Sequence, residues 1–170
     1  LIDRMEKITT QLKLFSRKSE DLTEKINLLD SVDASLSLIA SQLIDKRIRI
    51  KYQPPKGKLI VIGDQIKIQQ IIINLLNNAV DALENIEGAL ITIKFVCEKG
   101  ETQVKISDNG IGMDEPNSVF DPFFTTKSHG KGVVLCLSIS YDLPMKFGGN
   151  LKSKNIKPSG SEFTLTLRNG

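Results

Sequence analysis

The chain has 170 residues, 40% of them hydrophobic and 25% charged, which is enough for one globular domain with a sizeable core. Its net charge of +3 is small and its basic residues are scattered along the sequence, so a nucleic-acid partner is not expected. The two cysteines form no CxxC pair, and no segment is apolar enough to cross a membrane. These features favour a cytoplasmic chain without direct membrane contact.

The first expected element is a helix over residues 1–22. Its apolar residues recur at nearly the spacing of a coiled-coil seam, namely at Ile2, Met5, Ile8, Leu12 and Phe15. The stripe predicts a partner helix, and packing against the chain's own domain is the alternative. Because the sequence begins at Leu1 and is helical at once, we interpret it as a fragment of a longer protein.

The remaining sequence alternates helical and strand patterns. In chain order we predict a helix over 27–46, strands over 47–53 and 58–64, a helix through 69–83, strands over 89–98 and 102–108, a helix from about 134 to 141 or 143, and a strand over 162–167. Asp64 is positioned to cap the second of these helices. Helices on one face of a mixed sheet predict an α+β fold, a two-layer α/β sandwich with the N-terminal helix outside it.

The segment QQIIINLLNNAVDAL (69–83) is apolar at helical spacing but rich in asparagine, which is a mediocre helix former. On a helix, a core face is predicted to contain Ile68, Ile72, Leu75, Ala79 and Leu83. A second, polar face contains Gln70, Asn74, Asn78 and Asp81. Amide oxygens suit hydrogen bonding or a Mg²⁺ ion that phosphates also hold, and a buried amide network is the alternative.

The stretch VKISDNGIGM (104–113) places an aspartate on the inner face of a strand, because Val104 and Ile106 point inward and side chains alternate. A buried carboxylate is costly unless a group donates to it. The exocyclic amino group of a purine would satisfy Asp108, and the alternative is a structural turn in which Asp108 accepts from its own backbone.

The stretch FDPFFTTKSHGKG (120–132) combines three phenylalanines with Thr-Thr-Lys and a glycine-rich segment. Aromatic side chains can anchor the base of a loop while Lys127 and backbone N–H groups reach phosphates. Taken alone, this stretch is also compatible with an ordinary mobile loop whose base is anchored by hydrophobic side chains.

Together and in this order, these motifs resemble the catalytic ATP-binding domain of sensor histidine kinases, in the GHKL superfamily with the Bergerat fold. QQIIINLLNNAVDA resembles the N box, DNGIGM the G1 box, FDPFFTTK the F box and GKGVVLCLSIS the second glycine box. The resemblance covers about residues 26–168, which divides the chain into residues 1–25 and a catalytic domain over 26–170. FSRK (15–18) resembles the end of the second dimerisation helix in the nitrogen- and dicarboxylate-sensing branch.

The resemblance implies a set of nucleotide-binding residues. Asn78 would bind Mg²⁺, Asp81 would line the phosphate side, and Asp108 would accept from the adenine amino group. The full expected site is Asn74, Asn78, Asp81, Asp108, Gly110, Gly112, Met113, Phe124, Thr125, Thr126, Lys127, Gly130, Lys131, Gly132, Val133 and Leu135, with Asn78 as the metal ligand and ATP and Mg²⁺ as ligands.

The resemblance also implies the reaction and the partners. Asn74 stands where hydrolytic relatives commonly have a water-activating glutamate, and an amide cannot act as a base, so phosphoryl transfer to a protein nucleophile fits better than hydrolysis. Asn74 and the leading FSRK helix together disfavour a hydrolytic ATPase or a serine kinase of the anti-sigma type. The expected partners are a histidine on a dimerisation helix that this fragment lacks, a second copy of the full-length protein, and a response-regulator receiver domain. His129, in the expected lid, is not predicted to be the acceptor. The parent protein is expected to be anchored in the bacterial inner membrane.

The second glycine box departs from the family pattern, because Val134 and Cys136 replace two glycines. Glycines in a phosphate loop permit positive φ and close backbone approach to the ligand. We therefore expect weak nucleotide binding with little preference for ATP over ADP. The double change Val134→Gly, Cys136→Gly is expected to restore tighter ATP binding. The alternative function is a degenerate kinase domain that serves in dimerisation or docking.

Overall fold

The computed structural model describes residues 23–114, 116, 120 and 141–170. The expected N-terminal helix therefore lies outside the described residues, and the domain boundary at 25/26 stays a prediction. The named elements are β1 (Glu24–Asn27), α2 (Leu28–Asp45), β2 (Arg49–Tyr52), β3 (Ile60–Gly63), α3 (Gln65–Ala82), β4 (Leu90–Glu98), β5 (Glu101–Asp108), β6 (Asn150–Asn155) and β7 (Ser161–Arg168).

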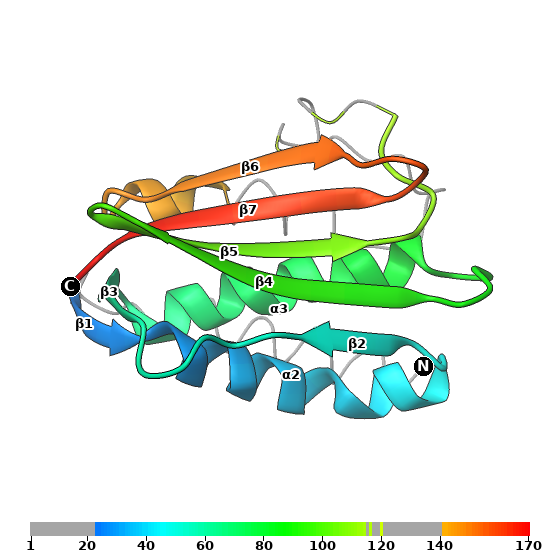
Figure 1. The fold of residues 1–170 in the computed structure, drawn as a ribbon, viewed down its shortest axis with the longest axis horizontal. Helices are drawn as coiled ribbons and strands as arrows, with labels where there is room; N and C mark the ends of the chain where they lie inside the picture. The colour runs from blue at the N-terminus through cyan, green and yellow to red at the C-terminus, as the bar shows by residue number, and fades with distance from the viewer. Residues whose placement is uncertain (1–22, 115, 117–119, 121–140) are drawn as a thin grey trace.

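A five-stranded sheet in the order β2-β4-β5-β7-β6 forms one layer of the molecule. β2 runs parallel to β4, and the other neighbouring strands are antiparallel, so the sheet is mixed as predicted. The helices α2 and α3 pack against each other and form the second layer, with α3 lying behind β4 and β5 in Figure 1. The predicted two-layer α/β sandwich is therefore confirmed.

The core lies between the sheet and the two helices. Inward-facing residues alternate along β5 and β7, where Val104, Ile106 and Leu165 are at most 1% exposed. The predicted core face of α3 is confirmed, because all five of its residues, Ile68, Ile72, Leu75, Ala79 and Leu83, are buried. The predicted cap is confirmed too: the Asp64 carboxylate accepts from the backbone N–H of Ile66 at 2.9 Å and of Lys67 at 3.1 Å.

Two strands were not predicted from the sequence. β1 pairs with β3 in a separate two-stranded antiparallel sheet, so β3 is not part of the main sheet. β6 forms the edge of the main sheet beside β7, although its sequence NLKSKN contains a single buried hydrophobic residue, Leu151. Edge strands are often short and carry charged side chains such as lysine, which protects their unpaired edge, so β6 shows almost no hydrophobic alternation.

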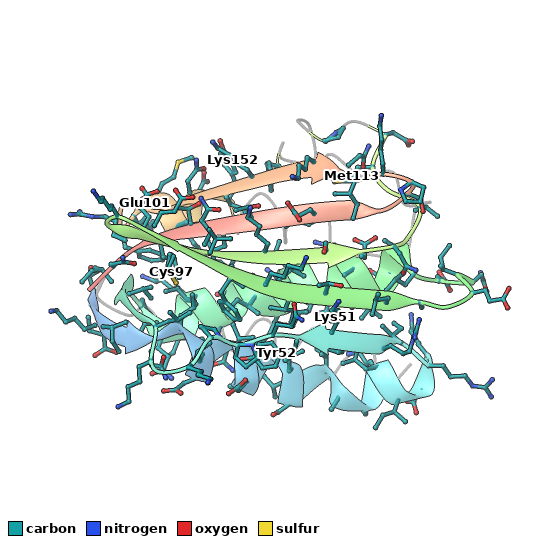
Figure 2. The ribbon with its side chains drawn as sticks, viewed as in Figure 1. Lys51, Tyr52, Cys97, Glu101, Met113 and Lys152 are labelled. Atoms are coloured by element: carbon teal, nitrogen blue, oxygen red, sulfur yellow. The ribbon has the colours of Figure 1, made fainter. Side chains whose placement is uncertain are left out.

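The opposite edge strand, β2, is joined to α2 by a side-chain hydrogen bond. The Tyr52 hydroxyl donates to the Asp33 carboxylate at 2.8 Å, and Figure 2 shows Tyr52 between β2 and α2. Burial and this bond to the Asp33 carboxylate hold the pKa of Tyr52 above its usual value.

Among the described residues, no helix is both long enough and apolar enough to cross a membrane, and this includes α2 and α3.

Candidate functional site

The polar face of α3 runs from the buried core toward solvent. Gln70 and Asn74 are buried at 8% and 6% exposure, Asn78 is half-buried, and Asp81 is exposed. The side-chain nitrogen of Asn78 is buried and has no hydrogen-bond partner in the described part of the chain. Most buried amide groups are paired, so this unpaired nitrogen makes Asn78 a candidate binding residue.

The predicted inward direction of Asp108 is confirmed, since this carboxylate is 3% exposed at the end of β5. One of its oxygens accepts from the backbone N–H of Gly110 at 2.9 Å. The other accepts from the Ser161 hydroxyl at 2.5 Å. The bond from the Gly110 N–H agrees with the alternative of a structural turn, in which Asp108 accepts from its own backbone. Each carboxylate oxygen has about two acceptor positions, so both oxygens keep capacity for a further donor.

Ser161 is the residue that the sequence analysis missed. It is the first residue of β7, is 3% exposed, and approaches Asp108 because β5 and β7 pair antiparallel with Ser107 opposite Glu162. Its position depends on strand pairing across 53 residues of sequence separation. The only local signal is the Gly160-Ser161 pair directly before the closing strand.

Two glycines allow the backbone to pack tightly around Asp108. A Cβ on Gly110 would overlap the carbonyl oxygen of Ala82, the last residue of α3. A Cβ on Gly160, which has φ of +113°, would overlap the carbonyl oxygen of Asp108 itself. The loop after β5 therefore lies against the end of α3, one turn beyond Asn78, so the aspartate and the asparagine face belong to one region of the molecule.

Met113 and Phe120 lie farther along the same loop. Met113 is half-buried against the core, at the end of the sheet where β5 and β6 finish and β7 begins (Figure 2). The ring of Phe120 stacks on Tyr141 with centroids 4.8 Å apart and meets the edge of Phe163 at 6.2 Å. The stack brings together the two residues that flank 121–140 in the sequence.

The rest of the expected site lies outside the described residues. These residues are Phe124, Thr125, Thr126, Lys127, Gly130, Lys131, Gly132, Val133 and Leu135, and the departures at Val134 and Cys136 lie there too. Their roles stay predictions. The described part includes Asn74, Asn78, Asp81, Asp108, Gly110, Gly112 and Met113. Among them, the structure shows the loop after Asp108 lying against the end of α3, at Ala82.

The described residues offer few charged side chains that could bind a metal ion together. Within the described ranges, no group of three or more His, Cys, Asp or Glu side chains is arranged to hold a metal. A magnesium ion usually binds through one or two carboxylates together with substrate phosphates and several waters. The half-buried amide of Asn78 can add a neutral oxygen to such a ligand set, because a side-chain amide has a carbonyl acceptor.

Comparison with curated proteins identifies similar sensor proteins. The chain is 34% identical over 172 residues to the two-component sensor PprA of Pseudomonas aeruginosa, covering 96% of this chain and 18% of that protein. It is 30% identical over 170 residues to the C4-dicarboxylate transport sensor protein DctB of Rhizobium meliloti, covering 99% of this chain and 27% of that protein. The chain thus spans between about a fifth and a quarter of the length of these relatives.

Solved structures agree with the fold. The catalytic domain of histidine kinase ThkA superimposes with a TM-score of 0.77 at 25% identity, covering 87% of this chain and 96% of that domain. ThkA in complex with the response regulator protein TrrA superimposes with a TM-score of 0.76 at 23% identity, covering 99% of this chain and 48% of that one. The two-layer sandwich is therefore a Bergerat-type fold. A family model matches residues 63–170, and the chain belongs to the histidine kinase-, DNA gyrase B-, and HSP90-like ATPase family.

Proposed function

We propose that this chain is the ATP-binding catalytic domain of a two-component sensor histidine kinase. The observation that carries the proposal is the buried Asp108, whose two oxygens are each bound by one donor and keep acceptor capacity. In the proposed complex, the exocyclic amino group of adenine donates to Asp108, and Ser161 orients the carboxylate. The family match and the kinase names of the relatives support this assignment.

The polar face of α3 is proposed to line the phosphate side of the site. Asn78 would hold Mg²⁺ through its amide oxygen, with Asp81 one turn farther toward solvent. When bound, Mg²⁺ supplies positive charge that neutralises the phosphate oxygens. The chain itself binds and orients the nucleotide, which is the main protein contribution to phosphoryl transfer.

The proposed reaction is transfer of a phosphoryl group to a histidine on a dimerisation helix. Asn74 cannot take a proton from water, so this face of α3 offers no general base for hydrolysis at that position. The phosphohistidine would then pass its phosphoryl group to a response regulator. The structure of ThkA with the response regulator protein TrrA supports this choice of partner. We place the domain in the cytoplasm, where ATP is available, within a membrane-anchored parent protein that acts as a dimer.

A first prediction tests the metal role of Asn78. The unaltered chain is expected to bind ADP about tenfold more tightly with Mg²⁺ than with EDTA, because the ion links the phosphates to the amide oxygen. Asn78→Ala should lose most of this dependence. Calorimetric titration with and without Mg²⁺ measures it.

The matched control is Asn77→Ala, which removes a half-buried amide from the neighbouring position of α3. This variant should keep the magnesium dependence of the unaltered chain. If both variants keep it, or both lose it, Asn78 is not the metal ligand.

A further inference from the structure

The loop between Asp108 and residue 116 is held at two separate points. Its first half is fixed to the neighbouring elements by Asn109, whose side chain accepts from the Leu90 N–H at 2.8 Å and donates to the Gly88 carbonyl at 3.2 Å. In addition, the Ile111 N–H donates to the Ala82 carbonyl at 3.3 Å, at the end of α3. These bonds secure the part of the loop next to Asp108.

The second half of the loop is fixed by two side chains from β6, Asn155 and Ser153. The Met113 N–H donates to the Asn155 side-chain oxygen at 2.8 Å, and the Asn155 side-chain nitrogen donates to the Met113 carbonyl at 2.6 Å. One amide thus satisfies both backbone groups of Met113, as a neighbouring strand would. We call this pair of bonds the Asn155 clamp. Nearby, the Ser153 hydroxyl donates to the Pro116 carbonyl at 2.7 Å.

The position of Asn155 in the sheet links the clamp to Asp108. In the β6–β7 pairing, Asn155 lies directly opposite Ser161, the residue that donates to the Asp108 carboxylate. Its backbone therefore helps to position Ser161 while its side chain positions Met113. The loop also packs closely against the Asn155 side chain. A Cβ on Gly112, which has φ of +76°, would lie 3.1 Å from the Asn155 side-chain oxygen.

We propose that Asn155 is a positioning residue for nucleotide binding: it holds Met113 and the loop after β5 in the shape that the base needs. This inference rests on the proposed function, because it assumes that the adenine binds beside Asp108. Asn155 is exposed and its two side-chain bonds go to the backbone of Met113, so it acts through the loop rather than on the ligand.

The test compares two asparagine clamps at opposite ends of the same sheet. Asn169 provides the matched control, since its side chain accepts from the Thr102 hydroxyl at 2.7 Å and donates to the Glu98 carbonyl at 3.4 Å, beside the β4–β5 hairpin. Asn155→Ala is expected to weaken ADP binding about tenfold, because two hydrogen bonds that order the loop are lost. Asn169→Ala should change it less than twofold.

Two further measurements separate positioning from general stability. Hydrogen exchange at the Met113 amide should become faster in Asn155→Ala and stay unchanged in Asn169→Ala. Asn155→Asp keeps the side-chain shape but sets a carboxylate oxygen against the Met113 carbonyl, so it should fold and also bind ADP more weakly.

Equal ADP affinity in the unaltered chain and in both folded Asn155 variants would overturn the inference and leave the proposed function standing. Equal weakening in Asn155→Ala and Asn169→Ala would also overturn it, because the effect would then be one of stability. If the unaltered chain binds no ADP, the proposed function fails, and the inference fails with it.

Discussion

Replacement of Gly160 by alanine is expected to lower the free energy of unfolding by about 2–5 kcal/mol. Gly160 has φ of +113°, and an added Cβ would overlap the carbonyl oxygen of Asp108. Positive φ costs an L-residue about 1–2 kcal/mol. Forcing an extra carbon into a packed position costs about 1–3 kcal/mol more. Urea denaturation of Gly160→Ala and the unaltered chain measures the difference.

Gly100 provides the control for this prediction. It also has positive φ, at +84°, but a Cβ there would meet nothing within 4 Å. Gly100→Ala should therefore lose only the conformational part, about 1–2 kcal/mol. If Gly160→Ala is no less stable than Gly100→Ala, Gly160 does not pack as closely against the Asp108 backbone as the structure shows.

The second large effect is expected from Asp108→Asn, which should weaken ADP binding by about 1–3 kcal/mol while the fold survives. Asparagine keeps one acceptor oxygen for the Gly110 N–H, and its nitrogen can donate to the Ser161 hydroxyl, which is able to accept. The local bonds can therefore be remade. The adenine amino group loses its acceptor where the amide nitrogen replaces the Asp108 oxygen, because a donor then faces a donor. Calorimetric titration with ADP measures the loss.

Asp33→Asn is the matched control, because it removes the same charge from an exposed aspartate of α2 that accepts from Tyr52 of β2. It should leave ADP affinity unchanged. Unchanged affinity in Asp108→Asn would remove this aspartate from the site. Loss of folding in that variant would instead favour the structural-turn alternative.

The features that the sequence predicted correctly depend on local periodicity. The core face of α3 follows from apolar residues three and four positions apart, and the inward direction of Asp108 follows from the alternation of Val104 and Ile106. The cap at Asp64 follows from its position directly before the helix. Each of these inferences needs only a few neighbouring residues, so pairing between distant segments does not affect them.

The features that were missed depend on pairing between distant segments. β6 has one buried hydrophobic residue, and its role as an edge strand is defined by β7. Ser161 and Asn155 are ordinary polar residues in the sequence, and they become important only because the β6–β7 hairpin brings them to Asp108 and Met113. The hydrogen bond between Asp108 and Ser161 spans 53 residues of sequence, so the Gly160-Ser161 pair is the one local signal for it and does not name its partner.

The central claim is that Asp108, Ser161 and the asparagine face of α3 form a magnesium-nucleotide site. Calorimetric titration of the unaltered chain with ADP, in the presence of Mg²⁺, tests it most directly. We expect saturable binding of one ADP per chain that weakens when Mg²⁺ is removed by EDTA. Absence of saturable binding at millimolar ADP, or binding that is indifferent both to Mg²⁺ and to Asp108→Asn, would contradict it.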